Sequence, residues 1–111
     1  MNNQEPATLE SLKSRIRDFS HARQWEKYHT PKNVAMAMIV EAAELLEHFQ
    51  WLTPEESVAL EPNIREDVRL EMADVLIYLV RLADLLEIDL LDAAADKLVL
   101  NAEKYPVDQH P

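Results

Sequence analysis

Two pairs of acidic residues, each with a spacing of three, interrupt stretches that are otherwise apolar. Glu41 and Glu44 lie within MIVEAAELLEHF, and Glu71 and Asp74 lie within LEMADVLIYL. At this spacing both carboxylates of a pair lie on one face of a helix, about one turn apart. Glu71 and Asp74 share their helical arc with Tyr78 and with leucines, so we expect them to project towards a contact between helices.

Carboxylates brought together by two packed helices repel one another, and burying them unpaired costs several kcal/mol. A hard divalent cation removes that penalty, and clustered carboxylate oxygens suit Mg²⁺ or Mn²⁺. The competing interpretation is that both pairs are ordinary surface acids of an acidic protein. Spacing and charge by themselves leave these two interpretations evenly balanced.

The composition excludes several classes of protein. The chain has 111 residues, a formal net charge of −10, no glycine and no cysteine. Without glycine, phosphate-cradling loops and dinucleotide-binding fingerprints are excluded, and without cysteine so are disulfides and thiolate zinc sites. The negative charge argues against bare nucleic acid and anionic membranes as partners. Because neither a signal-peptide pattern nor a membrane-spanning run is present, we expect a cytoplasmic protein.

Capping residues and prolines divide the chain into helices that must position the acids. Thr8, Thr30, Thr53, Asn63 and Asp89 are the expected N-caps, and a proline follows two of these threonines directly. The main helices are expected at about 9 to 25 or 28, 31 to 51, 64 to 87 and 90 to 104, and a short helix or turn is expected from 54 to near Pro62.

Four main helices with short connections predict an all-α, four-helix-bundle type of protomer. We expect a single domain over residues 8–106, between flexible tails at 1–7 and 107–111.

The blocks around the acids resemble a known family. VEAAELLEHFQW followed by EMADVLIYL resembles the E-x-x-E … E-x-x-D signature of the MazG-type nucleotide pyrophosphohydrolases. RQWEKYHTPKNVAMAM, HFQW, EMADVLIYLVRLAD and DKLVLNAEKYP are similar to the small dCTP pyrophosphatases of that superfamily. The resemblance covers about residues 15 to 106, and the ordered set of blocks is far more specific than E-x-x-E alone.

This resemblance implies an all-α enzyme that hydrolyses dCTP, or modified dCTP, to the monophosphate and pyrophosphate, for sanitation of the nucleotide pool. By motif position, Glu41, Glu44, Glu71 and Asp74 would be ligands of Mg²⁺, with Mn²⁺ as an alternative ion. An activated water would attack the α-phosphorus, with Glu44 or Glu47 as general base. It also implies a homodimer or homotetramer with sites built across subunits.

A second set of residues is expected to bind the nucleotide. Lys97, Asn101 and Lys104 form one polar stripe at helical spacing, which is usually a solvated face. The family blocks instead favour phosphate contacts for the lysines and a nucleotide contact for Asn101. Trp25 and Trp51 would by themselves be core residues, but the family blocks place them near the base, where an aromatic face can stack.

Two tyrosines complete the expected binding set. Tyr78, one turn beyond Asp74, fits a core tyrosine as well as a hydroxyl beside the metal or the nucleotide. Tyr105, directly before Pro106, would pack or close the pocket.

Other functions compete with this hypothesis. The same chemistry could act on other nucleoside triphosphates or on many, and a helical oligomerisation module could carry its acids for structural reasons only. A di-iron bundle is disfavoured because it needs two Glu-x-x-His pairs, and only Glu26 and His29 have that spacing. The sequence leaves open the base preference, the number of metal ions, the pathway, and the choice between dimer and tetramer.

Overall fold

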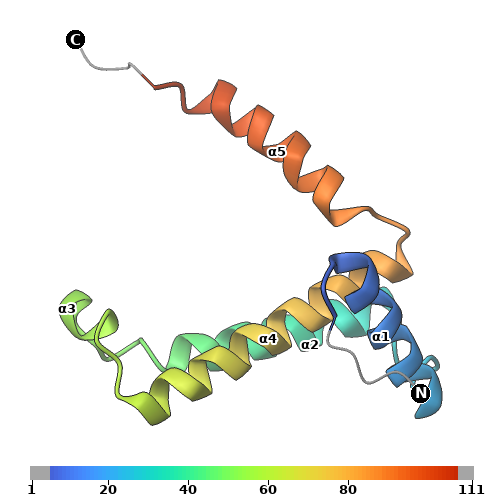
Figure 1. Cartoon of the computed structure of the whole chain (residues 1–111), viewed down its shortest axis with the longest axis horizontal. Coiled ribbons are helices and arrows are strands. Elements are labelled where there is room, and N and C mark those ends of the chain that lie inside the picture. The colour runs from blue at the N-terminus through green and yellow to red at the C-terminus, as the bar shows by residue number, and fades with distance from the viewer. Residues whose placement is uncertain (1–5, 108–111) are drawn as a thin grey trace.

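The chain folds into helices joined by short connections (Figure 1). The computed structural model describes residues 6–107, and within this range there is no strand. The helices are α1 (Leu9–Ala22), α2 (Pro31–Glu47), α3 (Pro54–Ser57), α4 (Pro62–Leu85) and α5 (Leu90–Lys104). The predicted all-α class is therefore confirmed. Most of the tails expected at 1–7 and 107–111 lie outside the described residues.

Side-chain caps begin four of the helices where the sequence predicted them. In each, the cap oxygen accepts a hydrogen bond from the backbone N–H three residues on, and the caps are Thr8, Thr30, Thr53 and Asp89. The prediction that Asn63 caps the long helix is wrong. α4 begins at Pro62, and its N-cap Glu61 makes no side-chain capping bond. Proline has no N–H to satisfy and a preset φ, so it can start a helix without such a cap.

The ends of α1 and α4 use left-handed residues in place of glycine. Gln24 has φ 57° and Glu87 has φ 56°. After α1 the Trp25 N–H donates to the Ser20 carbonyl at 3.0 Å, which is the closing bond of a Schellman motif. This turn ends α1 at Ala22, so the expectation that the helix continues to residue 25 or 28 is wrong.

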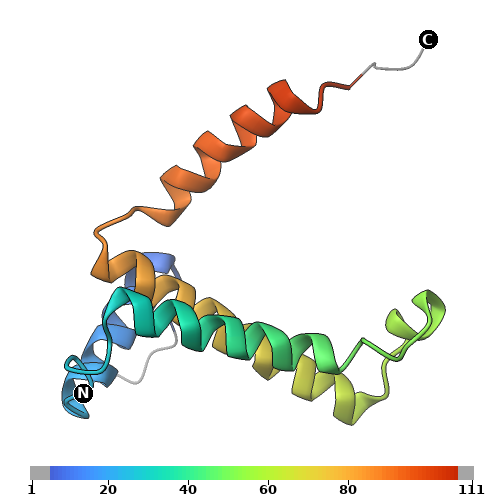
Figure 2. The same ribbon diagram turned by 180° about the vertical axis from the view of Figure 1, so that it is seen from behind.

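α2 and α4 run antiparallel, side by side, and α1 packs against the C-terminal half of α4 (Figures 1 and 2). The buried apolar residues of these three helices are Ile16, Val34, Val68, Val80 and Ala83. An ion pair also joins α1 to α4, since Arg17 Nη2 lies 2.6 Å from Asp84 Oδ1. Any site formed by residues of both α2 and α4 must therefore lie along the contact between these two helices.

α5 points away from the other helices and does not close the bundle within one chain (Figures 1 and 2). Every residue from 91 to 100 is exposed. Leu91, Leu98, Val99 and Leu100 are each more than half exposed, although all are apolar. The fourth main helix of the expected bundle is therefore present but unpacked. Within residues 6–107, no helix is both long and apolar enough to cross a membrane.

Candidate functional site

Acidic side chains from α2 and α4 meet at the contact between the two helices. Glu41 and Glu44 of α2 and Glu71 of α4 each place one carboxylate oxygen within 4.8 Å of the others. The contact makes this meeting possible, because Glu41, Glu44 and Glu71 lie on the helix faces that pack against each other. The structure thus brings together three of the four acids singled out in the sequence.

The carboxylates of this cluster repel one another, and their partial burial adds to the cost of their negative charge. Burial, and then the charges of Glu44 and Asp74, raise the pKa of Glu41 from 4.5 to about 7, with a further contribution from Glu71. Glu71 Oε2 is buried and has no hydrogen-bond partner among the described residues. A buried polar atom in that position is costly unless a ligand satisfies it. A hard divalent cation would relieve both the repulsion and the unsatisfied oxygen, so these residues fit such an ion.

Asp74 and Tyr78 lie beside the cluster on α4. The Asp74 side chain is exposed, but its charge is close enough to raise the pKa of Glu41. The pKa of the Tyr78 hydroxyl is raised by burial first, and then by the charges of Glu41 and Asp74. Glu47, one turn after Glu44, is exposed and is not part of the three-glutamate cluster.

A cavity of about 410 Å³ adjoins the acids and is lined by both Asp74 and Tyr78. It lies between α1, α4 and the α1–α2 connection, and Trp25 lines it from that connection. The Trp25 ring makes an edge contact with Phe19 at 5.6 Å and a tilted contact with His29 at 5.7 Å. This volume is within the range of small-molecule sites. Two of the predicted nucleotide-binding residues, Trp25 and Tyr78, therefore line one cavity next to the acids.

Sequence reasoning missed Arg81, which is only 5% exposed and lines the same cavity. Arg81 Nε donates to His29 Nδ1 at 3.1 Å. A usable signal was present, because Arg81 follows Asp74 by seven residues and therefore lies on the same helix face. Glu26 does not pair with His29; its Oε2 lies 2.6 Å from His21 Nδ1. Both side chains of the Glu26–His29 pair are therefore engaged with other residues.

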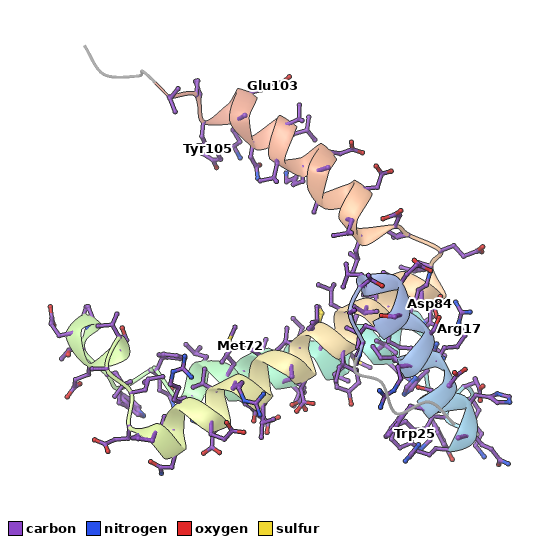
Figure 3. All side chains as sticks on the ribbon, viewed as in Figure 1. Arg17, Trp25, Met72, Asp84, Glu103 and Tyr105 are labelled. Atoms are coloured by element: carbon purple, nitrogen blue, oxygen red, sulfur yellow. The ribbon has the colours of Figure 1, made fainter. Side chains whose placement is uncertain are left out.

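The remaining predicted residues follow α2 or lie on and after α5, and α5 with Tyr105 points away from α2 and α4 (Figure 3). Trp51 is 86% exposed, and it follows the end of α2 at Glu47, so the expectation that α2 extends to residue 51 is wrong. Tyr105 is exposed beyond the end of α5, with Lys104 Nζ 5.3 Å from its ring centroid. The polar stripe on unpacked α5 consists of Lys97, Asn101 and Lys104.

Residues 36–111 match the MazG-like family. The chain belongs to the MazG-like family. This matched segment contains all four acids and the whole of α5, and it begins after Trp25 and His29. The cavity therefore combines a wall inside the MazG-like segment with a wall formed by residues that precede it.

The chain is also similar to individual curated proteins. The chain is 39% identical to dCTP pyrophosphatase 1 of Rattus norvegicus over 102 residues, covering 90% of this chain and 60% of the relative. The chain is likewise 39% identical to dCTP pyrophosphatase 1 of Homo sapiens over 101 residues, covering 89% of this chain and 59% of the relative. The chain thus spans about 60% of the length of these curated relatives.

A solved structure shows the same architecture. The crystal structure of a pyrophosphatase from Archaeoglobus fulgidus DSM 4304 is 40% identical, with a TM-score of 0.84. The similarity covers 96% of this chain and 99% of that one. The unpacked arrangement of the helices in one chain is therefore close to that of a crystallised relative.

Proposed function

We propose that this MazG-like protein is a Mg²⁺-dependent nucleoside triphosphate pyrophosphohydrolase that converts dCTP and modified dCTP to dCMP and pyrophosphate, in nucleotide-pool sanitation. The observation that carries the proposal is the convergence of Glu41, Glu44 and Glu71 around an unsatisfied, buried carboxylate oxygen. The choice of dCTP is supported by the relatives named dCTP pyrophosphatase 1.

Glu41, Glu44, Glu71 and Asp74 are the residues proposed to hold the ion, with Mn²⁺ as a substitute. When bound, the ion would neutralise phosphate oxygens and lower the pKa of a bound water. A water attacks the α-phosphorus, the α–β P–O bond breaks, and pyrophosphate leaves with the bonding electron pair. Glu44 and Glu47 are the candidates for the group that accepts the proton of this water.

The nucleoside is proposed to occupy the cavity beside the acids. Trp25 offers an aromatic face for stacking, and Phe19 and His29 restrict the rotation of its ring by their contacts. Tyr78 lies between this aromatic end and the acids, since it is one turn from Asp74 on α4. Its hydroxyl, with a pKa raised above the usual value, stays protonated at neutral pH and can donate to a sugar or phosphate oxygen.

We also propose that the protein works as a homodimer or homotetramer. Helices α2 and α5 expose apolar side chains that one chain leaves uncovered, among them Ile39, Val40, Leu91 and Leu98. A second copy covering them would let α5 and the region of Trp51 contribute to a neighbouring site, which gives roles to Lys97, Asn101, Lys104 and Tyr105. Light scattering coupled to size exclusion tests this, and a monomer that hydrolyses dCTP would contradict it.

Product analysis tests the proposed activity directly. The protein is incubated with dCTP and Mg²⁺, with and without EDTA, and the products are resolved by anion exchange. dCMP with pyrophosphate, formed only without EDTA, is the expected result, and dCDP with orthophosphate would contradict it. Failure to turn over any nucleotide would favour the oligomerisation module. Equal turnover of dCTP, 5-methyl-dCTP, dUTP, dTTP and dATP would favour the broad-specificity alternative.

A further inference from the structure

A buried guanidinium lies at the end of the cavity away from the acids. Asp74, Tyr78 and Arg81 recur at i, i+4 and i+7 on α4 and all line this cavity. From Asp74 to Arg81 the helix axis rises about 10 Å. This span is comparable to the length of a nucleoside monophosphate. With the phosphate at the acids, the base would lie between Trp25 and Arg81.

The charge of Arg81 is poorly compensated by the protein. Its Nη1 lies 3.5 Å from Asp84 Oδ2, at the outer limit of a hydrogen bond. Asp84 is mainly bound by Arg17, at 2.6 Å and 3.0 Å. The hydrogen bonds of Arg81 to described residues use Nε and Nη1, and none of them uses Nη2. Because a buried cation with weak pairing is costly, its N–H groups are suited to an acceptor on a ligand.

The hydrogen bond between Arg81 and His29 determines the tautomer of the histidine. A guanidinium has no acceptor atom, so His29 Nδ1 must accept from Arg81 Nε, and the proton of the neutral ring is on Nε2. Burial, and then the charge of Arg81, lower the pKa of His29, so the ring is neutral at neutral pH. Arg81 and His29 therefore both offer N–H donors.

We propose that Arg81 and His29 are specificity-determining residues that select a base with two adjacent acceptors, the O2 and N3 atoms of cytosine. This inference rests on the proposed function, and it explains the base preference by chemistry on the cavity wall. Uracil and thymine carry an N–H at position 3, which would face another donor. A buried donor left unpaired in this way discriminates more strongly than a change of size does.

Binding of non-hydrolysable analogues tests this selection without turnover. Isothermal calorimetry measures the affinity of α,β-imido-dCTP and α,β-imido-dUTP in the presence of Mg²⁺. The wild type is expected to prefer the cytosine analogue by about tenfold or more, and Arg81→Met to remove most of that preference. His29→Asn keeps an acceptor for Arg81 but loses the Nε2 donor, so it is expected to lower the preference several-fold.

Arg17→Met is the matched control. Arg17 shares Asp84 with Arg81 but does not line this cavity. It should therefore keep the full preference for the cytosine analogue. If Arg81→Met does not fold, Arg81→Lys keeps a cation but loses the Nε donor, and the same loss of preference is expected. Circular dichroism melts establish that each variant is folded.

Several outcomes would overturn the inference. One is a folded Arg81 variant with unchanged preference, and another is a wild type that binds both analogues equally or binds neither. Equal weakening of both analogues by Arg81→Met would mean that Arg81 contacts phosphate instead of base. Stronger binding of the corresponding guanine analogue would also contradict it. A failure of the proposed hydrolysis is separate, because it is measured as the absence of dCMP and pyrophosphate.

Discussion

Glu41 of α2 and Glu71 of α4 place carboxylate oxygens within 4.8 Å of each other across the contact between the two helices. Two carboxylates this close repel each other, and a proton on one of them relieves the repulsion. Consistent with this, the pKa of Glu41 is raised to about 7, with burial as the main cause. Proton and divalent cation therefore compete for the same oxygens, and this competition makes the site testable in the absence of any substrate.

The first prediction concerns the pH dependence of stability without metal. The pKa of Glu41 is about 7 in the folded protein against a usual value of 4.5, so the folded state binds this proton more tightly. Stability from this group is full below about pH 4.5 and is lost as the pH rises through 7, by about 1 to 2 kcal/mol. Urea unfolding in EDTA between pH 5 and 8 measures it.

Glu41→Gln is the comparison for this measurement, because it removes the titrating group. The lowered pKa of His29 acts in the opposite direction, since its stabilising effect is lost as the pH falls, but it is common to both proteins. The difference between wild type and variant should therefore grow with pH. A difference that is constant from pH 5 to 8 would show that the pKa of Glu41 is not raised in the folded protein.

The second prediction concerns metal binding. Mg²⁺ should raise the melting temperature of the wild type, corresponding to about 2.7 kcal/mol at a concentration one hundred times the dissociation constant. Glu71→Gln should abolish the increase, because its buried Oε2 is the oxygen without a partner. Glu66→Gln on the same helix is the control, since Glu66 is exposed and bound to Arg69. An equal loss in both variants would indicate nonspecific screening of charge.

The third prediction separates the two candidates for the general base. Glu44→Gln should lose both the Mg²⁺-induced stabilisation and turnover of dCTP, because Glu44 belongs to the cluster. Glu47→Gln should keep the stabilisation and, if Glu47 is the base, lose turnover by about a hundredfold or more. Melting curves and initial rates, measured on the same samples, distinguish these cases. Full activity of Glu47→Gln would assign the role to Glu44.

The fourth prediction concerns the structural cost of the carboxylates. Glu41→Gln and Asp74→Asn should abolish turnover and yet leave the metal-free protein as stable as the wild type or more stable, because each removes like-charge repulsion. Thermal melts in EDTA measure this. If both variants unfold, the carboxylates hold the fold together and are not a metal site.

Local patterns in the sequence predicted most of the elements, and together with the family resemblance they predicted the acid cluster. Each side-chain cap accepts a hydrogen bond from a backbone N–H only three residues away, so these capping roles can be predicted without a structure. The residues are Thr8, Thr30, Thr53 and Asp89. For the acids, the i, i+3 spacing and a flanking apolar stripe indicated the face of each helix but left a metal site and ordinary surface acids evenly balanced, and the family resemblance favoured the metal site. Their meeting required only that the two acid-bearing helices pack.

What the sequence did not predict depends on contacts between distant segments or on backbone strain. Arg81 acquires its role from His29, fifty-two positions earlier, through a hydrogen bond that no local pattern encodes. The early end of α1 depends on Gln24 adopting a conformation that is uncommon for residues other than glycine. The separation of α5 could not be predicted from the sequence. Its apolar residues form the same core-facing pattern whether the helix packs against its own chain or against another chain.

The last prediction concerns the ion pair between Arg17 and Asp84, which lie next to each other where α1 meets α4 (Figure 3). The hydrogen bond from Arg17 is the main cause that lowers the pKa of Asp84 below 3.8. Its stabilisation is therefore full above about pH 4 and is lost as the pH falls through the lowered pKa. Asp84→Asn should cost about 2 kcal/mol at pH 7, because Asp84 is nearly buried and also faces Arg81.

Urea unfolding of wild type and Asp84→Asn at pH 7 and at pH 3 measures both effects. The gap between the two proteins should shrink at pH 3, because below the ordinary pKa of 3.8 the unfolded wild type takes up a proton at Asp84 and unfolding is favoured. Glu66→Gln breaks an exposed ion pair with Arg69 on the same helix, and it should change stability far less. If Asp84→Asn and Glu66→Gln are equally mild at pH 7, then apolar packing, and not this ion pair, holds α1 on α4.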